Sequence, residues 1–268
     1  MSHSNRVIHV TSADGTRIGA TVTGKGRPLV ISHGSINSAA HWAPFAAAMS
    51  SCMTVYAVDR RGRGESADHE TYEFQREVED IEAVLQKAGP DAVLLGHSFG
   101  ALVALGVALQ RSLPALVLYE PPAPLSGPVG GDAVVRYESA INKGDLYEAL
   151  AIGSSEFVKF PTVTAETLRT IPGFAERALL APTWSREIRA TDGFGADLKR
   201  FASISAPTLM FTGLQSPKWI VENSRKIQRS IPTSHLVELP NQAHDAFASD
   251  PQYFAQQVLM FLGEHEAA

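Results

Sequence analysis

The chain has 268 residues, of which 44% are hydrophobic and 19% are charged, and its formal net charge is −5. This size and composition suit one globular domain, or one domain with a sizeable insertion. Charges of one sign do not form a long run, which argues against a nucleic-acid surface and against a polybasic membrane anchor.

The N-terminal stretch from Met1 to Arg6 is polar and lacks an apolar signal core, and no apolar stretch is long enough to span a bilayer. These features predict a cytoplasmic protein that does not associate with membranes. The single cysteine, Cys52, rules out an internal disulfide, and its place beside an apolar run predicts a buried thiol.

Short apolar runs alternate with helical patterns over the first 120 residues. A turn signal at Asp14-Gly15 joins the first two expected strands into an antiparallel hairpin. The expected strands are 6–11, 18–23, 28–32, 53–58, 92–95 and 115–119, and the expected helices are 72–88 and 100–110.

From residue 121 to 205 no convincing strand pattern occurs, and Gly and Pro break four short helical patterns at 132–142, 146–157, 165–171 and 175–180. Alternation resumes with a strand at 208–212, a helix at 218–230, a strand at 234–239 and a helix at 251–262. The pattern predicts an α/β protein with a mostly parallel sheet and helices on both faces. Residues 1–120 and 206–268 would form its core, and residues 121–205 a helical cap above the carboxyl ends of the strands, where ligands bind.

The segment Gly96-His97-Ser98-Phe99-Gly100 lies between an apolar run and an Ala/Leu/Val-rich helical pattern. A Gly-x-Ser-x-Gly sequence in a strand-turn-helix context is typical of a nucleophile elbow, in which the serine hydroxyl stands clear of the sheet edge. Gly96 and Gly100 are expected where side chains would collide with the neighbouring strand and helix. We therefore identify Ser98 as the candidate nucleophile.

Taken together, four motifs in this order resemble the α/β-hydrolase-fold superfamily: His33-Gly34, the segment 59–66 in the form Asp-x-x-Gly-x-Gly-x-Ser, the elbow at 96–100, and His244 near the C-terminus. The resemblance covers nearly the whole chain. It implies a mostly parallel eight-stranded sheet with a helical cap, a serine hydrolase mechanism, and no metal or organic cofactor. It says little about the substrate, because this fold hosts many chemistries.

A serine hydroxyl needs a base to remove its proton, and the base is expected on a loop after the last strand. His244 follows the strand that ends at Leu239 and fits the chain order serine, acid, histidine. We expect His97 to shape the elbow or the pocket floor, and His33 to brace the loop that carries an oxyanion donor.

The acid departs from the usual family pattern, because Gly213-Leu214-Gln215-Ser216 carries no carboxylate where Gly-x-x-Asp is common. Some family members, similar to zearalenone hydrolase, place the acid after the strand that follows the elbow helix, and there this chain has Glu120. Glu222 and Asp245 are the alternatives, and a third reading is that no acid exists. We favour Glu120, since pairing with the imidazole N–H would explain a carboxylate between an apolar strand and two prolines.

Two N–H groups should hold the oxyanion that forms on attack by Ser98. Phe99 N–H follows the nucleophile directly, and the family position implies Ser35 N–H as the second donor. The segment 59–66 lacks the Gly-Lys-Ser/Thr ending of a phosphate-binding loop, so we interpret it as a structural loop in which Asp59 and the arginines form ion pairs.

The expected reaction is cleavage of a carboxylic ester or lactone through an acyl-enzyme, with a small apolar ester or lactone as substrate. C–C bond hydrolysis, thioester cleavage, acyl transfer and perhydrolysis would use the same residues. An aspartate would replace Ser98 in an epoxide hydrolase or a dehalogenase of this fold. A protein that only binds a small ligand is the alternative of a different class, and a homodimer is compatible with the sequence.

Overall fold

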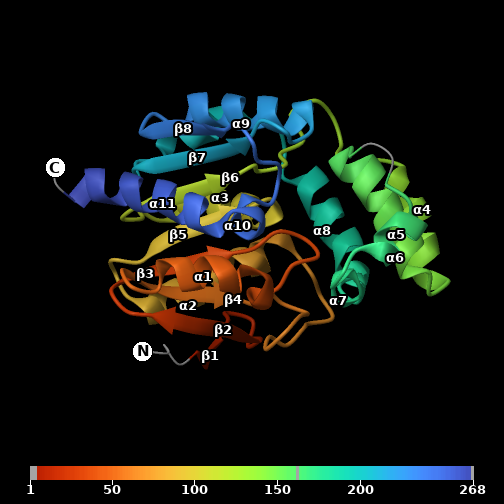
Figure 1. Ribbon diagram of the computed structural model, residues 1–268, viewed down its shortest axis with the longest axis horizontal. Helices are drawn as coiled ribbons and strands as arrows, with labels where there is room; N and C mark the ends of the chain where they lie inside the picture. Colours follow the sequence, from red (N-terminus) through yellow and green to blue (C-terminus); the bar gives the residue numbers. More distant parts are fainter. Residues whose placement is uncertain (1–4, 161–162, 267–268) are drawn as a thin grey trace. The chain divides into compact units, whose positions relative to one another are not determined.

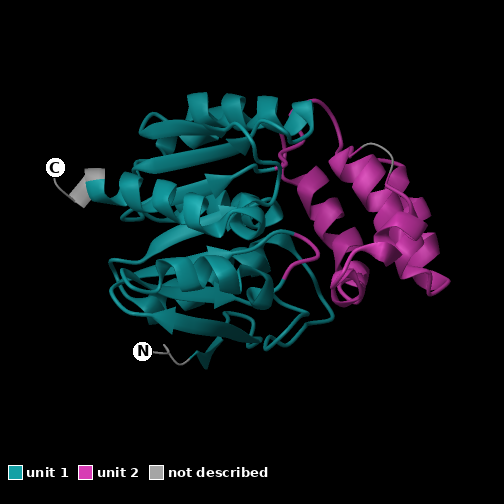
Figure 2. Ribbon diagram, viewed as in Figure 1, with its two compact units in different colours: residues 1–34, 38–121, 197–268 teal, residues 35–37, 122–196 magenta. Residues whose placement is uncertain are grey.

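The computed structural model describes residues 5–160 and 163–266, which form two compact units (Figures 1 and 2). The larger unit comprises the residues up to 34, residues 38–121 and the residues from 197 onward. The smaller one, called the helical unit below, comprises residues 35–37 and 122–196. Residues 197–205, which the sequence pattern assigned to the insertion, thus belong to the larger unit.

The larger unit is built on a sheet whose strand order is β1-β2-β4-β3-β5-β6-β7-β8. Its strands are β1 (Arg6–Thr11), β2 (Arg17–Gly24), β3 (Arg27–Ser32), β4 (Met53–Val58), β5 (Val93–His97), β6 (Leu116–Tyr119), β7 (Thr208–Gly213) and β8 (Ser234–Leu239). The pairs β1–β2 and β2–β4 are antiparallel, and every other neighbouring pair is parallel. The prediction of a mostly parallel eight-stranded sheet is confirmed.

Helices cover both faces of this sheet, which explains why its central strands are continuous apolar runs. In Figure 1, α1 (Ala43–Met49), α10 (Ala246–Ser249) and α11 (Pro251–Glu266) lie in front of the sheet, and α2 (Phe74–Ala88) and α3 (Phe99–Gln110) lie behind it. A further helix, α9 (Lys218–Ser230), packs on β7 and β8. All residues of β5 and β6 are buried. Trp42 is fully buried and stacks on Phe247, with ring centroids 4.0 Å apart, so it belongs to the core.

The helical unit has an aromatic core of its own. Its helices are α4 (Ala133–Asn142), α5 (Leu146–Ile152), α6 (Ala165–Thr170), α7 (Phe174–Ala178) and α8 (Ala181–Gly193), with a π-helical turn at Gly153–Val158. The rings of Tyr137, Phe157 and Trp184 contact one another with centroids 5.3–5.8 Å apart. The Tyr137 hydroxyl donates to the Ala181 carbonyl at 2.8 Å.

Several local predictions need correction. The sequence pattern missed α1, α8 and α10, and the helix expected at 146–157 divides into α5 and the π-helical turn. Pro at the start of α1 and α8 is compatible with a first helical turn, where its missing N–H has no partner to lose. Cys52 is exposed rather than buried, because it lies in the turn between α1 and β4. No helix within residues 5–160 or 163–266 combines the length and the apolarity that a membrane crossing needs.

Candidate active site

Ser98 lies at the sharp turn between β5 and α3 and has the backbone angles φ 52° and ψ −124°. A residue other than glycine with positive φ is strained, and such strain is concentrated at functional sites. The two flanking glycines allow the turn. A Cβ on Gly96 would lie 2.5 Å from Gly100 O, and a Cβ on Gly100 would lie 2.0 Å from Ser32 O. The close packing of β3, β5 and α3 thus holds the half-buried Ser98 at the end of β5.

The two expected oxyanion donors have different surroundings. Phe99 is the first residue of α3, and the first N–H groups of a helix have no carbonyl partner within it. Gly34 lies against the elbow, since a Cβ on it would come within 2.8 Å of Ser98 Cβ. Ser35 follows Gly34 directly and belongs to the helical unit, so the role of its N–H stays a prediction.

His244 lies on the loop that joins β8 to α10, residues 240–245, which we call the His244 loop. Its side chain is 17% exposed, and its Nδ1 is hydrogen-bonded to Glu120 Oε2. An imidazole that donates from Nδ1 to a carboxylate keeps Nε2 available to accept a proton. Because a carboxylate accepts, Nδ1 of His244 is the donor in this hydrogen bond, as it is in a histidine that acts as a general base.

Glu120 follows β6 and is fully buried, with φ 49°. Its Oε1 accepts hydrogen bonds from Thr212 Oγ1 at 2.9 Å and from Gly213 N at 2.7 Å. Its Oε2 accepts one from Ser216 Oγ at 2.9 Å, besides the contact with His244. Burying a carboxylate is unfavourable unless hydrogen bonds or charges compensate it, and four donors do so here. Ser216, which stands where the acid is usual, thus donates to the carboxylate that contacts His244.

The two alternative acids lie elsewhere. Glu222 is part of α9, is half exposed, and lies 3.9 Å from Lys218 Nζ. Asp245 is exposed and forms the N-terminal cap position of α10. The structure thus joins Glu120 with His244. Ser98 directly follows His97, whose ring is hydrogen-bonded to the His244 loop. A hydrogen bond between Ser98 Oγ and the His244 ring stays a prediction.

His33 is buried beneath the Gly34 backbone. Arg60 N–H donates to its Nε2 at 3.4 Å, so its Nδ1–H donates to Gly34 O at 2.8 Å. Burial, together with the positive charges of Arg60 and Arg63, holds the pKa of His33 well below its usual value. The neutral ring thus braces the backbone next to Ser35, as we expected.

The low pKa of His33 predicts a loss of stability in acid. Below about pH 6.5 the unfolded chain binds a proton at this position, whereas the folded chain does not, so the free energy of unfolding falls as pH falls. The contribution is at most about 1.4 kcal/mol per pH unit for one proton. Urea unfolding between pH 7.5 and 5 should show a shallower fall for His33→Asn than for the wild type. Equal slopes of the free energy of unfolding against pH for the two proteins would contradict this prediction.

The segment after β4 is held by buried ion pairs. Arg60 Nη1 lies 3.0 Å from Glu77 Oε1, and Arg61 pairs with Asp80 and Asp14. Asp59 accepts N–H bonds from Ala39 at 2.7 Å and Glu65 at 3.1 Å. The predicted ion pairs of Arg60 and Arg61 are confirmed, and their partners come from α2 and from the hairpin turn. For Asp59 the structure shows hydrogen bonds from backbone N–H groups in place of the expected ion pair.

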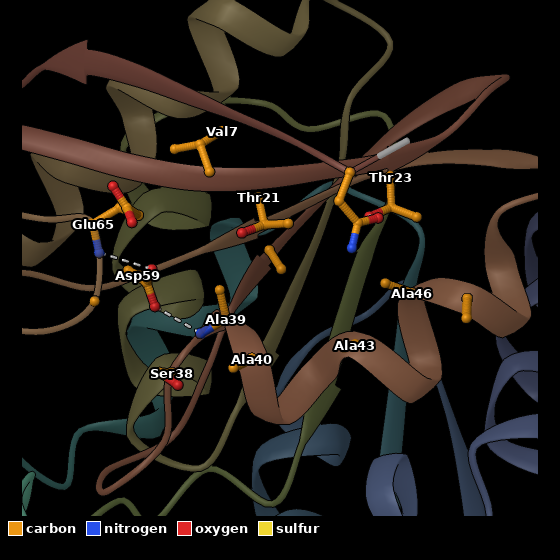
Figure 3. A pocket seen from close by; sticks show the side chains of 14 residues that line it. Val7, Thr21, Thr23, Ser38, Ala39, Ala40, Ala43, Ala46, Asp59 and Glu65 are labelled. Atoms are coloured by element: carbon orange, nitrogen blue, oxygen red, sulfur yellow. Dashed lines mark hydrogen bonds between the residues drawn. The ribbon is translucent and has the colours of Figure 1, made fainter. Parts of the chain in front are cut away.

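Asp59 also lines a cavity of about 480 Å³ in the larger unit (Figure 3). Side chains of β1 and β2, among them Val7, Thr21 and Thr23, face small alanine side chains of α1 across this cavity. Neither Ser98, Glu120 nor His244 belongs to its lining, so it is separate from the candidate active site.

Sequence reasoning missed the residues that support Glu120 and His244. Thr212 lies inside an apolar strand and carries no motif, and the same is true of Tyr119, whose hydroxyl donates to Ala243 O next to His244. Ser216 stands out in the sequence only as a serine where an acid is usual. Within residues 5–160 and 163–266, no group of three or more His, Cys, Asp or Glu side chains could hold a metal ion.

Comparisons with known proteins find similarity over most of the chain. The model of the Alpha/beta hydrolase family matches residues 29–257. A putative carbamate hydrolase, RutD, of Klebsiella pneumoniae is 28% identical over 243 residues, which are 85% of this chain and 89% of that protein. An alpha/beta hydrolase from Sphaerobacter thermophilus superposes with a TM-score of 0.87 at 32% identity, over 95% of this chain and 100% of that one. For the esterase RhEst1 from Rhodococcus sp. the TM-score is 0.71 at 25% identity, over 96% and 98%.

Proposed function

Because the chain belongs to the α/β-hydrolase family, we propose that it is a serine hydrolase that cleaves a carboxylic ester or lactone through an acyl-enzyme on Ser98. The observation that carries the proposal is the contact between Nδ1 of His244 and the fully buried carboxylate of Glu120. In a serine hydrolase these two groups activate the nucleophile, which would here be Ser98, the strained serine at the end of β5.

In the proposed reaction His244 Nε2 removes the proton from Ser98 Oγ as that oxygen attacks the carbonyl carbon. His244 then gives the proton to the departing alkoxide, which leaves as an alcohol and leaves the acyl group on Ser98. A water molecule, deprotonated by His244, attacks the acyl carbon, and the acid is released as Ser98 regains its proton. Glu120 orients the ring throughout and stabilises the imidazolium.

Negative charge forms on the substrate oxygen in both steps, and Phe99 N–H and Ser35 N–H are the proposed donors to it. Loss of one donor of this kind typically raises the barrier by about 3–4 kcal/mol. Both groups belong to the backbone, so exchanging the Ser35 side chain should affect the rate less than an insertion in residues 34–37.

Reaction with a serine-directed phosphonate tests the proposal. We expect the wild type to hydrolyse p-nitrophenyl acetate and butyrate and to gain the mass of one phosphonyl group, on Ser98. Ser98→Ala removes the nucleophile and should abolish both labelling and burst turnover while the fold persists. A wild type that is folded but neither labelled nor active would contradict the proposal and favour a binding protein.

Cleavage of an amide or carbamate bond is a second candidate, because two relatives aligned over most of this chain are named for substrates that contain such a bond. These are the putative carbamate hydrolase and the 2-(acetamidomethylene)succinate hydrolase of Mesorhizobium japonicum, which is 25% identical over 249 residues. Matched esters, lactones, carbamates and amides with the same acyl group would separate the candidates by their kcat/KM values.

A further inference from the structure

The His244 loop is bound to the ends of three neighbouring strands. Successive carbonyl groups of this loop accept one hydrogen bond each: Gln242 O from Gln215 N at 3.0 Å, Ala243 O from the Tyr119 hydroxyl, and His244 O from His97 Nε2 at 2.8 Å. The donors follow or end β7, β6 and β5, which are adjacent in the sheet in this order. The loop therefore crosses the carboxyl ends of the three strands, with one carbonyl bound at each.

We propose that Tyr119 and His97 are positioning residues that set the place of His244 as general base by binding the backbone on both sides of its Cα. This inference rests on the proposed function of the same site. Glu120 fixes the direction of the imidazole ring, but the position of the ring relative to Ser98 also depends on where the His244 backbone is held. A displacement of about 1 Å from the reactive geometry can lower a rate about 100-fold.

Tyr119 is suited to this task because its hydroxyl has two partners on the loop. It donates to Ala243 O and accepts a hydrogen bond from Ala246 N at 3.3 Å, so it holds residues before and after His244. Burial raises the pKa of Tyr119, and the charge of Glu120 raises it further. The hydroxyl therefore keeps its proton and remains a donor. The ring is fully buried and lies 5.3 Å from the Phe254 ring, which limits its movement.

His97 links the base to the nucleophile. Its Nε2 carries the proton that it donates to His244 O, and its next residue is Ser98. The ring is buried and lies 4.6 Å from the His244 ring between centroids. A shift of the elbow is therefore transmitted to the His244 backbone through one side chain, so that nucleophile and base keep their relative positions.

The test compares two substitutions that remove the same group from equally buried rings. Tyr119→Phe removes the hydroxyl that holds the loop, and Tyr137→Phe removes a hydroxyl that donates to Ala181 O in the helical unit. We expect Tyr119→Phe to lower kcat about 10- to 100-fold with KM changed less than about twofold. Tyr137→Phe should leave kcat within about twofold of the wild type.

His97 is tested by a pair of variants, one of which keeps a donor. Glutamine places an amide N–H near the position of Nε2, whereas leucine has no donor, so His97→Gln should retain much more kcat than His97→Leu. Equal kcat for these two variants, or a kcat of Tyr119→Phe equal to that of the wild type, would overturn the positioning role.

A spectroscopic readout separates this inference from the proposed function. The proton between His244 Nδ1 and Glu120 should give a far-downfield NMR resonance, assigned by its loss in Glu120→Gln. We expect this resonance to shift and broaden in Tyr119→Phe and to be unchanged in Tyr137→Phe, whether or not a substrate has been found. An unchanged resonance in Tyr119→Phe rejects the positioning role, whereas failed labelling of wild-type Ser98 rejects the proposed function.

Discussion

Replacing Glu120 with glutamine should lower kcat about 1,000- to 10,000-fold, the order of loss seen when the triad carboxylate of a serine protease becomes an amide. The amide oxygen can still accept from Thr212 and Gly213, as Oε1 does now. Its NH₂ group then faces the Ser216 hydroxyl and His244 Nδ1, where Oε2 accepts now. To receive this hydrogen bond His244 must move its proton to Nε2, and it then cannot take a proton from Ser98.

The matched comparison is Ser216→Ala, which removes one donor from the same carboxylate oxygen. The carboxylate keeps its bonds with Thr212, Gly213 and His244, so we expect kcat to fall less than about tenfold. Steady-state kinetics with one ester substrate measures both variants, and near-ultraviolet circular dichroism checks that each remains folded. Equal rates for Glu120→Gln and Ser216→Ala would reject Glu120 as the acid.

Replacing Arg61 with methionine should reduce the free energy of unfolding by about 3–5 kcal/mol, because it leaves a buried carboxylate without its partner. Arg61 is fully buried, and its Nε and Nη2 each lie 2.7 Å from an oxygen of Asp80. Its Nη1 lies 3.0 Å from Asp14, so one side chain joins the loop after β4 to α2 and to the hairpin turn. Burial lowers the pKa of Arg61, but the hydrogen bonds and charges of Asp80 and Asp14 raise it by more, so its pKa lies above the usual value and the side chain stays protonated.

Two further variants show whether burial is the cause. Arg61→Met combined with Asp80→Leu removes both charges and should be less destabilised than Arg61→Met alone. Arg189→Ala breaks an exposed pair with Glu138 of similar geometry, with a distance of 2.7 Å, and should cost about 0–1 kcal/mol. Urea unfolding gives all three values. A similar loss for Arg61→Met and Arg189→Ala would mean that the buried pair contributes no more than a surface pair.

The strands were predicted well because their signal is local. The runs at β4 and β8 have the expected bounds, since a buried parallel strand is a continuous apolar run bounded by turns. The helices α1 and α8 were missed for the opposite reason. Residues 43–49 are mostly alanine, and α8 begins Ala-Pro-Thr, so neither shows a strong helical period. Packing of α1 against the sheet, and of α8 against the aromatic rings of Tyr137 and Phe157, supplies the stability that their sequences do not signal.

The position of Ser98 could be inferred from its neighbours in the chain, because a strand, a tight turn between glycines and a helix are contiguous there. The acid could not be inferred in the same way. Nothing within a few residues of Glu120 says that Thr212, Gly213 and Ser216 donate to it, since they lie about 90 residues away along the chain. Only the pairing of β6 with β7 brings these groups to one carboxylate.

Residue order and apolar periodicity were thus enough to derive a sheet, an elbow and a histidine that follows the last strand. Each strand, the elbow and the order of these elements along the chain can be inferred from residues that are close together in the sequence, which a linear pattern records. Glu120 was favoured as the partner of His244 from the family resemblance, but its other hydrogen-bond partners and the binding of the His244 loop by Tyr119 and His97 required the folded structure. They depend on which strand ends lie next to each other, and hydrogen-bond donors from β5, β6 and β7 meet there only after the sheet has formed.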